Sequence, residues 1–193
     1  MYPVKTENLF NEPFAWSTDT FSNEELDLIV RLGKELPMQD AGVNNTGIAS
    51  LDTRRSKISW IKPEINTEFI FRRVAEIVNR LNDNFYKYDL TEMEDIQFSE
   101  YDESYQGMYA NHTDDGFEGY GRKLSFSLQL SDEDEYEGGD LLFYRFKANS
   151  PLYAPKKKGM IVIFPSWTIH EVAPVTKGTR YSLVGWVHGP NFR

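Results

Sequence analysis

The sequence predicts a mostly-β domain with flanking helices (α+β), in which a sandwich or barrel of the jelly-roll type is buttressed by N-terminal helices. Two observations predict this fold. Before about residue 95, apolar residues recur at helical spacing; after it, short alternating stretches are separated by glycine and proline turns. No repeat or linker divides the 193 residues, so we expect a single domain over residues 1–193, with helical support over roughly 1–94 and the β core over roughly 95–190.

Two helices are expected in the first half. The first begins after Ser22, which forms a capping box with Glu25. The second follows Pro63, and its apolar face should pack on a sheet. Between the helices we expect a polar loop over Gly42–Gly47 and a strand over Ser56–Ile61. The apolar faces comprise Leu26, Ile29 and Val30 in the first helix, and Phe69, Ile70, Val74, Ile77, Val78, Leu81 and Phe85 in the second.

Five strands are expected in the second half. In the clearest one, Leu124–Leu130, leucine and phenylalanine alternate strictly with Ser125, Ser127 and Gln129, which is typical of a half-buried strand with one buried face. Helices packed on one side of such strands would support a jelly-roll core. The other four expected strands are Ile96–Tyr101, Asp140–Phe146, Met160–Phe164 and Thr179–Val187.

The composition excludes several classes of function. The chain has no cysteine, which excludes disulfides, zinc–thiolate sites, iron–sulfur clusters and cysteine nucleophiles. Its net charge of -9 disfavours nucleic-acid binding, because phosphates require basic surface. No stretch approaches the roughly 20 apolar residues of a membrane span, and residues 1–5 show no apolar signal core. We therefore expect a soluble, intracellular (cytoplasmic) protein with no nucleic-acid partner and no membrane partner.

The most informative residues are two histidines, an aspartate and an arginine. His112 and Asp114 point to the same face if the backbone is extended, because residues i and i+2 share a face. His170 follows a strand end and a turn, which can deliver its ring from another strand. Two imidazoles and one carboxylate with open positions are typical of a mononuclear Fe(II) oxygenase site. Arg180, ten residues after His170, suits a dicarboxylate cosubstrate, since a guanidinium binds a carboxylate through two parallel hydrogen bonds.

Each of these residues also has an ordinary structural explanation. A histidine two residues before an aspartate is a common coincidence, and a strand arginine such as Arg180 often lies along apolar neighbours at the surface. The combination favours the site, because only three histidines exist and two lie at strand ends in the right order. For the third, His188, we expect an exposed or packing role. The aromatic residues Tyr109, Trp167 and Trp186 are candidate walls of the site, although core packing is the simpler explanation.

The segments around these residues resemble one known family. Tyr101–Asp114 is similar to the tyrosine–glycine–tyrosine–His-x-Asp segment of the prolyl 4-hydroxylase-like 2-oxoglutarate/Fe(II) dioxygenases. Leu124–Tyr144 resembles the central strands of that family, and Gly159–Gly189 resembles its closing part, which holds the cosubstrate arginine. The resemblance covers roughly residues 95–190. An arginine at position 180, where animal collagen-type members have a lysine, is closer to bacterial and phage relatives.

The resemblance implies a double-stranded β-helix and a dioxygenase that uses Fe(II), 2-oxoglutarate and O2, with ascorbate as a further candidate cofactor. By matching position, Arg180 would bind the distal carboxylate of 2-oxoglutarate. The reaction would couple oxidative decarboxylation to succinate and CO2 with hydroxylation of a C–H bond. By family analogy the substrate would be a peptidyl residue such as proline, with a small molecule as the alternative. The implied iron ligands are His112, Asp114 and His170.

Helper residues and competing functions remain open. Tyr101 would assist cosubstrate binding, with Tyr109 as the alternative because the stretch after Tyr101 is about two residues longer than usual. Ser182 shares a strand face with Arg180 and can add a hydrogen bond. The loops Gly42–Gly47 and Gly116–Arg122 are candidate lids. The competing functions are a jelly-roll metalloenzyme that does not use 2-oxoglutarate, and a non-catalytic binding module.

Overall fold

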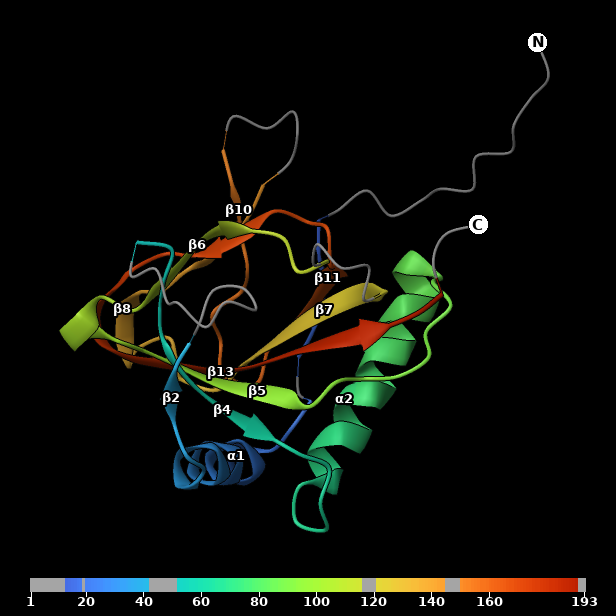
Figure 1. Cartoon of the computed structure of the whole chain (residues 1–193), viewed down its shortest axis with the longest axis horizontal. Helices are drawn as coiled ribbons and strands as arrows, with labels where there is room; N and C mark the ends of the chain where they lie inside the picture. The colour runs from blue at the N-terminus through green and yellow to red at the C-terminus, as the bar shows by residue number, and fades with distance from the viewer. Residues whose placement is uncertain (1–12, 19, 42–51, 116–120, 145–149, 191–193) are drawn as a thin grey trace.

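Two antiparallel sheets face each other in a computed structural model of the chain (Figure 1), which describes residues 13–18, 20–41, 52–115, 121–144 and 150–190. The expected jelly-roll core is confirmed. The major sheet has the order β1 (Ala15–Ser17), β11 (Ile161–Pro165), β7 (Arg122–Gln129), β13 (Val175–His188), β5 (Ile96–Asp102), β4 (Lys57–Ile61), β2 (Gln39–Asp40), and β8 (Tyr136–Gly138) also pairs with β13. The minor sheet has the order β10 (Leu152–Tyr153), β9 (Leu141–Phe143), β12 (His170–Val172), β6 (Met108–His112), β3 (Arg54–Arg55).

Two helices, α1 (Asn23–Glu35) and α2 (Glu68–Leu81), lie on the outer face of the major sheet (Figure 1). The predicted capping box of α1 is confirmed: the Ser22 backbone N–H donates to the Glu25 carboxylate at 2.8 Å, and the Glu25 N–H donates to the Ser22 hydroxyl at 3.3 Å. Gly33 allows a close approach to the sheet, because a Cβ there would lie 2.3 Å from the Phe98 ring. The buried residues of this interface include Leu26, Ile29, Ile70, Val74, Ile77, Val78, Phe98, Leu124, Phe126 and Leu128.

The half-buried state predicted for Leu124–Leu130 is wrong, because β7 is buried on both faces. Its polar side chains are as inaccessible as its apolar ones: Ser125 is 0%, Ser127 8% and Gln129 5% exposed. The alternation itself is real, but the minor sheet covers the polar face. The inner face of the major sheet is therefore rich in hydrogen-bonding groups. Its buried polar residues include Gln97, Ser99, Ser125, Ser127, Gln129, Arg180 and Ser182.

The first half of the chain contributes strands as well as helices. The expected strand at Ser56–Ile61 is observed as β4, and the short strands β1 and β2 join the major sheet while β3 joins the minor one. In the second half, β5, β7, β9, β11 and β13 correspond to the five expected strands. The predicted loop at Gly42–Gly47 lies outside the described residues, as do residues 116–120 of the second candidate lid and residues 145–146 of the expected strand that contains β9. Among the described residues, no helix is long and apolar enough to cross a membrane.

Candidate active site

The pairing of two short strands brings the three predicted metal ligands together. His112 ends β6 and His170 begins β12, and the two residues lie directly opposite each other in the ladder between these strands. Asp114 follows His112 by two residues, and its backbone N–H donates to the Ser166 carbonyl at 2.7 Å. The ligand atoms of the three side chains all lie within 4.8 Å of one another. His112 and His170, which are 58 residues apart in the sequence, therefore lie next to each other between the sheets.

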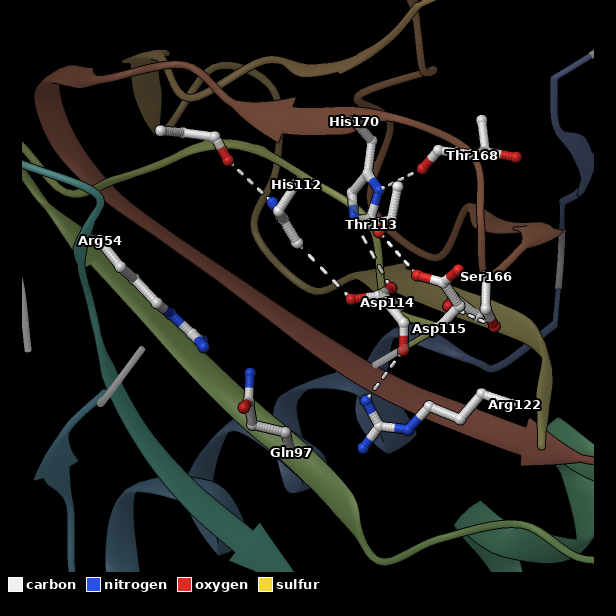
Figure 2. A network of polar contacts seen from close by, with 12 residues as sticks. Arg54, Gln97, His112, Thr113, Asp114, Asp115, Arg122, Ser166, Thr168 and His170 are labelled. Atoms are coloured by element: carbon white, nitrogen blue, oxygen red, sulfur yellow. Dashed lines mark hydrogen bonds and ion pairs between the residues drawn. The ribbon is translucent and has the colours of Figure 1, made fainter. Parts of the chain in front are cut away.

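Backbone carbonyls orient both imidazole rings. The Nδ1 atom of His112 lies 2.8 Å from the Ala110 carbonyl, and Nδ1 of His170 lies 2.9 Å from the Thr168 carbonyl (Figure 2). A carbonyl accepts only, so Nδ1 carries the proton and Nε2 presents its lone pair. The two Nε2 atoms lie 3.6 and 3.5 Å from the Asp114 carboxylate oxygens. One of these oxygens, Oδ2, is buried without a hydrogen-bond partner among the described residues.

The electrostatics of the three residues suit a metal cation. Burial, and after it the charge of His170, lowers the pKa of His112 to about 4. Burial favours the protonated form of Asp114, but the charges of His170 and His112 outweigh it and hold the pKa of that carboxyl below its usual range. His112 is therefore neutral and Asp114 ionised at neutral pH, which are the forms that bind metals. Two imidazole nitrogens and one hard carboxylate, with an orphaned oxygen between them, fit Fe(II).

A second part of the site surrounds Arg180 on β13. Arg180 is 3% exposed, pairs in register with Tyr101 on β5, and holds its guanidinium carbon 5.5 Å from the centre of the Tyr101 ring. Among the described residues, no carboxylate forms an ion pair with it. Ser182, on the same strand face, is 0% exposed, and its hydroxyl has no hydrogen-bond partner in the described part of the chain. A buried guanidinium and a buried hydroxyl without protein anions fit a carboxylate ligand.

The pocket at Arg180 contains two residues that were not predicted as site residues from the sequence, Gln129 and Tyr136. The Gln129 amide donates to the Tyr136 hydroxyl at 3.0 Å, and both side chains line the pocket together with Arg180. Burial raises the pKa of Tyr136, although the charge of Arg180 opposes the shift. Gly139, with φ +61°, leaves room for both groups, because a Cβ there would lie 3.1 Å from the Arg180 and Tyr136 side chains. The Gly138-Gly139 pair after Tyr136 was the available signal in the sequence.

The two candidate helper tyrosines occupy different places. Tyr101 lies beneath Arg180, whereas Tyr109 stacks on His112 with ring centres 3.5 Å apart. Burial raises the pKa of Tyr109, and the nearby charge of Arg54 opposes the shift. The structure thus associates Tyr101 with Arg180 and Tyr109 with the metal ligand His112.

A charged network lies behind Asp114. The Arg122 guanidinium binds both oxygens of Glu94 at 2.6 and 2.7 Å and donates to the Asp114 carbonyl at 3.2 Å. His188, for which an exposed or packing role was expected, is part-buried and lies 2.6 Å from Glu94. Arg122 also covers the ring of Trp186, which is 8% exposed. This network fixes the backbone of Asp114 from the side opposite the histidines.

The third candidate wall residue, Trp167, differs from the other two. It is 39% exposed, and its ring contacts that of Tyr88 with centres 5.6 Å apart. Tyr109, by contrast, contacts the metal ligand His112, and Trp186 contacts Arg122 behind Asp114.

Comparison with known proteins agrees with this geometry. Residues 96–188 match the 2OG-Fe(II) oxygenase superfamily. The chain is 31% identical over 147 residues to a PKHD-type hydroxylase of Crocosphaera subtropica, covering 72% of this chain and 62% of the relative. It is 44% identical over 80 residues to a PKHD-type hydroxylase of Prochlorococcus marinus, covering 41% of this chain and 35% of the relative. The match therefore spans between about a third and three fifths of these curated relatives.

Solved structures share the fold at low sequence identity. A prolyl-4-hydroxylase of Pseudomonas putida superposes with a TM-score of 0.75 at 18% identity, covering 94% of this chain and 95% of that one. A prolyl hydroxylase of Trichoplax adhaerens, solved in complex with a peptide fragment of hypoxia inducible factor, gives a TM-score of 0.78 at 19% identity, covering 93% of this chain and 84% of that one. At this level of identity the likeness concerns the fold.

Proposed function

We propose, from the match of residues 96–188 to the 2OG-Fe(II) oxygenase superfamily, that the chain is a prolyl 4-hydroxylase-like dioxygenase dependent on Fe(II) and 2-oxoglutarate. Its reaction hydroxylates a C–H bond and converts 2-oxoglutarate and O2 to succinate and CO2. The observation that carries the proposal is the presence of two sets of buried groups, one at the minor sheet and one on β13 of the major sheet. The metal-binding set is His112, Asp114 and His170, and the carboxylate-binding set is Arg180 and Ser182.

Each side chain has a definite task in this reaction. His112, Asp114 and His170 would hold the metal, and three protein ligands would leave further metal positions free. Iron bound there would supply the oxygen activation that the protein's own groups lack. Arg180 anchors the far carboxylate of 2-oxoglutarate, and the Ser182 hydroxyl donates to the same group. The apolar residues around the metal, Phe143 and Phe164, contact the His170 ring and exclude water from it.

The proposed substrate is a peptidyl residue such as proline. Support comes from the prolyl hydroxylase names of the structural neighbours and from the peptide in the Trichoplax adhaerens complex. A small molecule with a similar C–H bond is the alternative. Ascorbate is proposed as a reductant that restores Fe(II).

An anaerobic titration tests the reaction class. Fe(II) and then 2-oxoglutarate are added to the purified chain, and the weak visible charge-transfer band of the chelate is followed. We expect the band in the wild type and its loss in Asp114→Ala. If iron binds and no band forms, the chain is a metalloenzyme that does not use 2-oxoglutarate. If iron does not bind, the non-catalytic binding module becomes the better explanation.

A further inference from the structure

The strand β3 brings a buried cation to the metal centre from the N-terminal half of the chain. Arg54 is only 8% exposed, and its Nε donates to the Ser56 hydroxyl at 2.9 Å. Its guanidinium carbon lies 4.5 Å from the centre of the Tyr109 ring, and that ring stacks on His112. Figure 2 shows the Arg54 side chain extending toward Gln97 and toward the part of the view that holds His112, Asp114 and His170. A fixed positive charge therefore lies close to the metal ligand His112, with one aromatic ring between them.

The described protein groups do not neutralise this charge. No ion pair of the described residues includes Arg54, which contacts the Ser56 hydroxyl and the face of the Tyr109 ring. Arg122, the other arginine near the triad, differs because Glu94 binds it through both oxygens. An arginine cannot shed its proton in a protein, so a buried one without a counter-charge is costly unless it meets an anion. The positive charge of Arg54 is therefore not balanced by a carboxylate of the described residues.

The cosubstrate does not account for Arg54. The distal carboxylate has its own cation in Arg180 on β13, whose pocket is lined from β7, β8, β9, β11 and the segment between β10 and β11, and Arg54 is not part of that lining. Arg54 instead stands on β3, at the edge of the minor sheet next to β6. The two cations stand on different strands of different sheets, Arg54 on β3 and Arg180 on β13. One anion therefore cannot account for both arginines, and we expect a separate anion at each of them.

We propose that Arg54 binds a carboxylate of the substrate, with Tyr109 beneath it and the Gln97 amide beside it. This inference rests on the proposed function and adds a substrate class to it: the compound that is oxidised carries a carboxylate close to the carbon that reacts. The carboxylate is either that of a free amino acid or that of an acidic peptide. In both cases the guanidinium fork of Arg54 orients the substrate against the metal ligands.

A simple carboxylate probe tests the site. The protein is loaded anaerobically with Fe(II) and saturating 2-oxoglutarate, and its melting temperature is measured with acetate, or with acetamide as the neutral control. We expect acetate to raise the melting temperature of the wild type and acetamide to leave it unchanged. Arg54→Gln should abolish the acetate effect. Arg54→Lys keeps the charge and should retain part of the effect, so it serves as the control for a loss of folding caused by the substitution itself. An acetate effect that survives Arg54→Gln overturns the proposal, and so does an acetate effect no larger than that of acetamide.

Two further measurements separate the alternatives. Affinity for 2-oxoglutarate, followed by the charge-transfer band, should be the same in Arg54→Gln and wild type; a loss there would make Arg54 a cosubstrate residue and overturn the proposal. A wild type that forms no band would refute the proposed function instead. Two pairs of compounds then identify the source of the carboxylate. Tighter binding of L-proline than of L-prolinamide indicates a free amino acid, and tighter binding of a blocked Pro-Glu peptide than of its Pro-Gln counterpart indicates an acidic peptide. Equal binding within both pairs contradicts a carboxylate site.

Discussion

The two faces of β7 are equally buried and chemically opposite. Leu124, Phe126 and Leu128 pack toward the helices, while Ser125 and Ser127 face the interior between the sheets, and none of the five is more than 8% exposed. On the outer face, burial of apolar surface stabilises the fold. On the inner face, burial of polar groups opposes folding unless they find partners. Inaccessibility alone therefore does not identify a structural core: a buried polar face indicates a place built for a ligand.

This comparison predicts a separation of effects. Changes on the inner face should weaken ligand binding at little cost in stability, and changes on the outer face should do the reverse. The variants below test that separation, beginning with the largest expected effect.

Replacing His170 with alanine should abolish iron binding and turnover, because the metal loses one of three protein ligands. The free energy of unfolding of the metal-free protein should change far less, since the ring belongs to the interior surface. Anaerobic Fe(II) titration and urea unfolding measure the two quantities. His188→Ala is the matched control and should keep iron binding, because His188 contacts Glu94 and not the ligand set. Wild-type turnover in His170→Ala would refute the ligand assignment.

On the outer face, Phe126→Ala should lower the free energy of unfolding by about 3–5 kcal/mol, the usual cost of removing a buried aromatic ring. The ring is 0% exposed, and a Cβ on Gly185 would lie 2.4 Å from the Phe126 Cζ atom. The glycine on the neighbouring strand β13 therefore leaves room for this ring. Urea denaturation gives the magnitude. Under conditions where the variant is folded, its affinity for 2-oxoglutarate should match that of the wild type. A large loss of affinity in the folded variant would break the separation of the two faces.

Arg180→Ala should raise the 2-oxoglutarate requirement at least about 30-fold, equivalent to about 2 kcal/mol. Isothermal titration with the iron-loaded protein under anaerobic conditions provides the measurement. Arg180→Lys serves as the control, because it keeps the charge but loses the two parallel hydrogen bonds, and its effect should be intermediate. An unchanged requirement in the alanine variant would place the cosubstrate anchor elsewhere.

Tyr136→Phe sharpens the picture of the same pocket. Loss of the hydroxyl beside Arg180 and Gln129 should weaken 2-oxoglutarate binding by roughly fivefold, or about 1 kcal/mol, the usual value of one hydrogen bond. The same titration applies. Tyr105→Phe is the control, since the Tyr105 hydroxyl bonds to Glu100 and does not line the pocket. Equal weakening in both variants would mean that Tyr136 acts through general stability.

The smallest effect is expected at Glu94. Burial works against ionisation of this carboxyl, but hydrogen bonds and charge from Arg122 and then His188 lower its pKa. A depressed pKa adds stability that is present above the ordinary value of 4.5 and is lost as the pH falls through the folded-state pKa. Glu94→Gln should remove about 0.5 kcal/mol near neutral pH and flatten the acid side of the stability profile. The measurement is the free energy of unfolding in urea as a function of pH. The exposed Glu92→Gln is the control and should leave this pH profile unchanged.

Much of the site could be predicted from the sequence because its chemistry is carried by rare residues at strand ends. Only three histidines exist, so the pair His112 and His170 stood out together with Arg180. Tyr136 and Arg54 did not stand out, since a tyrosine before a turn and one arginine of a pair have many ordinary roles. Their positions depend on which strands become neighbours, and spacing along the chain carries no information on that.

The fold shows the same division. Long periodic elements such as α2 and β7 were predicted, because a face repeated over several turns or residue pairs gives a clear signal. The two-residue strands β2 and β3 are too short to show any period. Periodicity also could not reveal that the serine face of β7 is covered. An alternating strand looks the same whether its polar side meets water or a second sheet.

The pairing of β13 has a consequence for insertions and deletions. Between Thr179 and Val184 this strand is in unbroken register with β5, and its irregularities lie near its two ends, at Val175/Lys177 and at Val187/His188. Because side chains alternate with a period of two, one residue added within the regular stretch would turn Arg180 or Ser182 toward the helices while leaving the ladder of hydrogen bonds almost intact. The site depends on the register of β13 more than on the identity of most of its residues. We therefore expect insertions and deletions to be tolerated only at the ends of this strand.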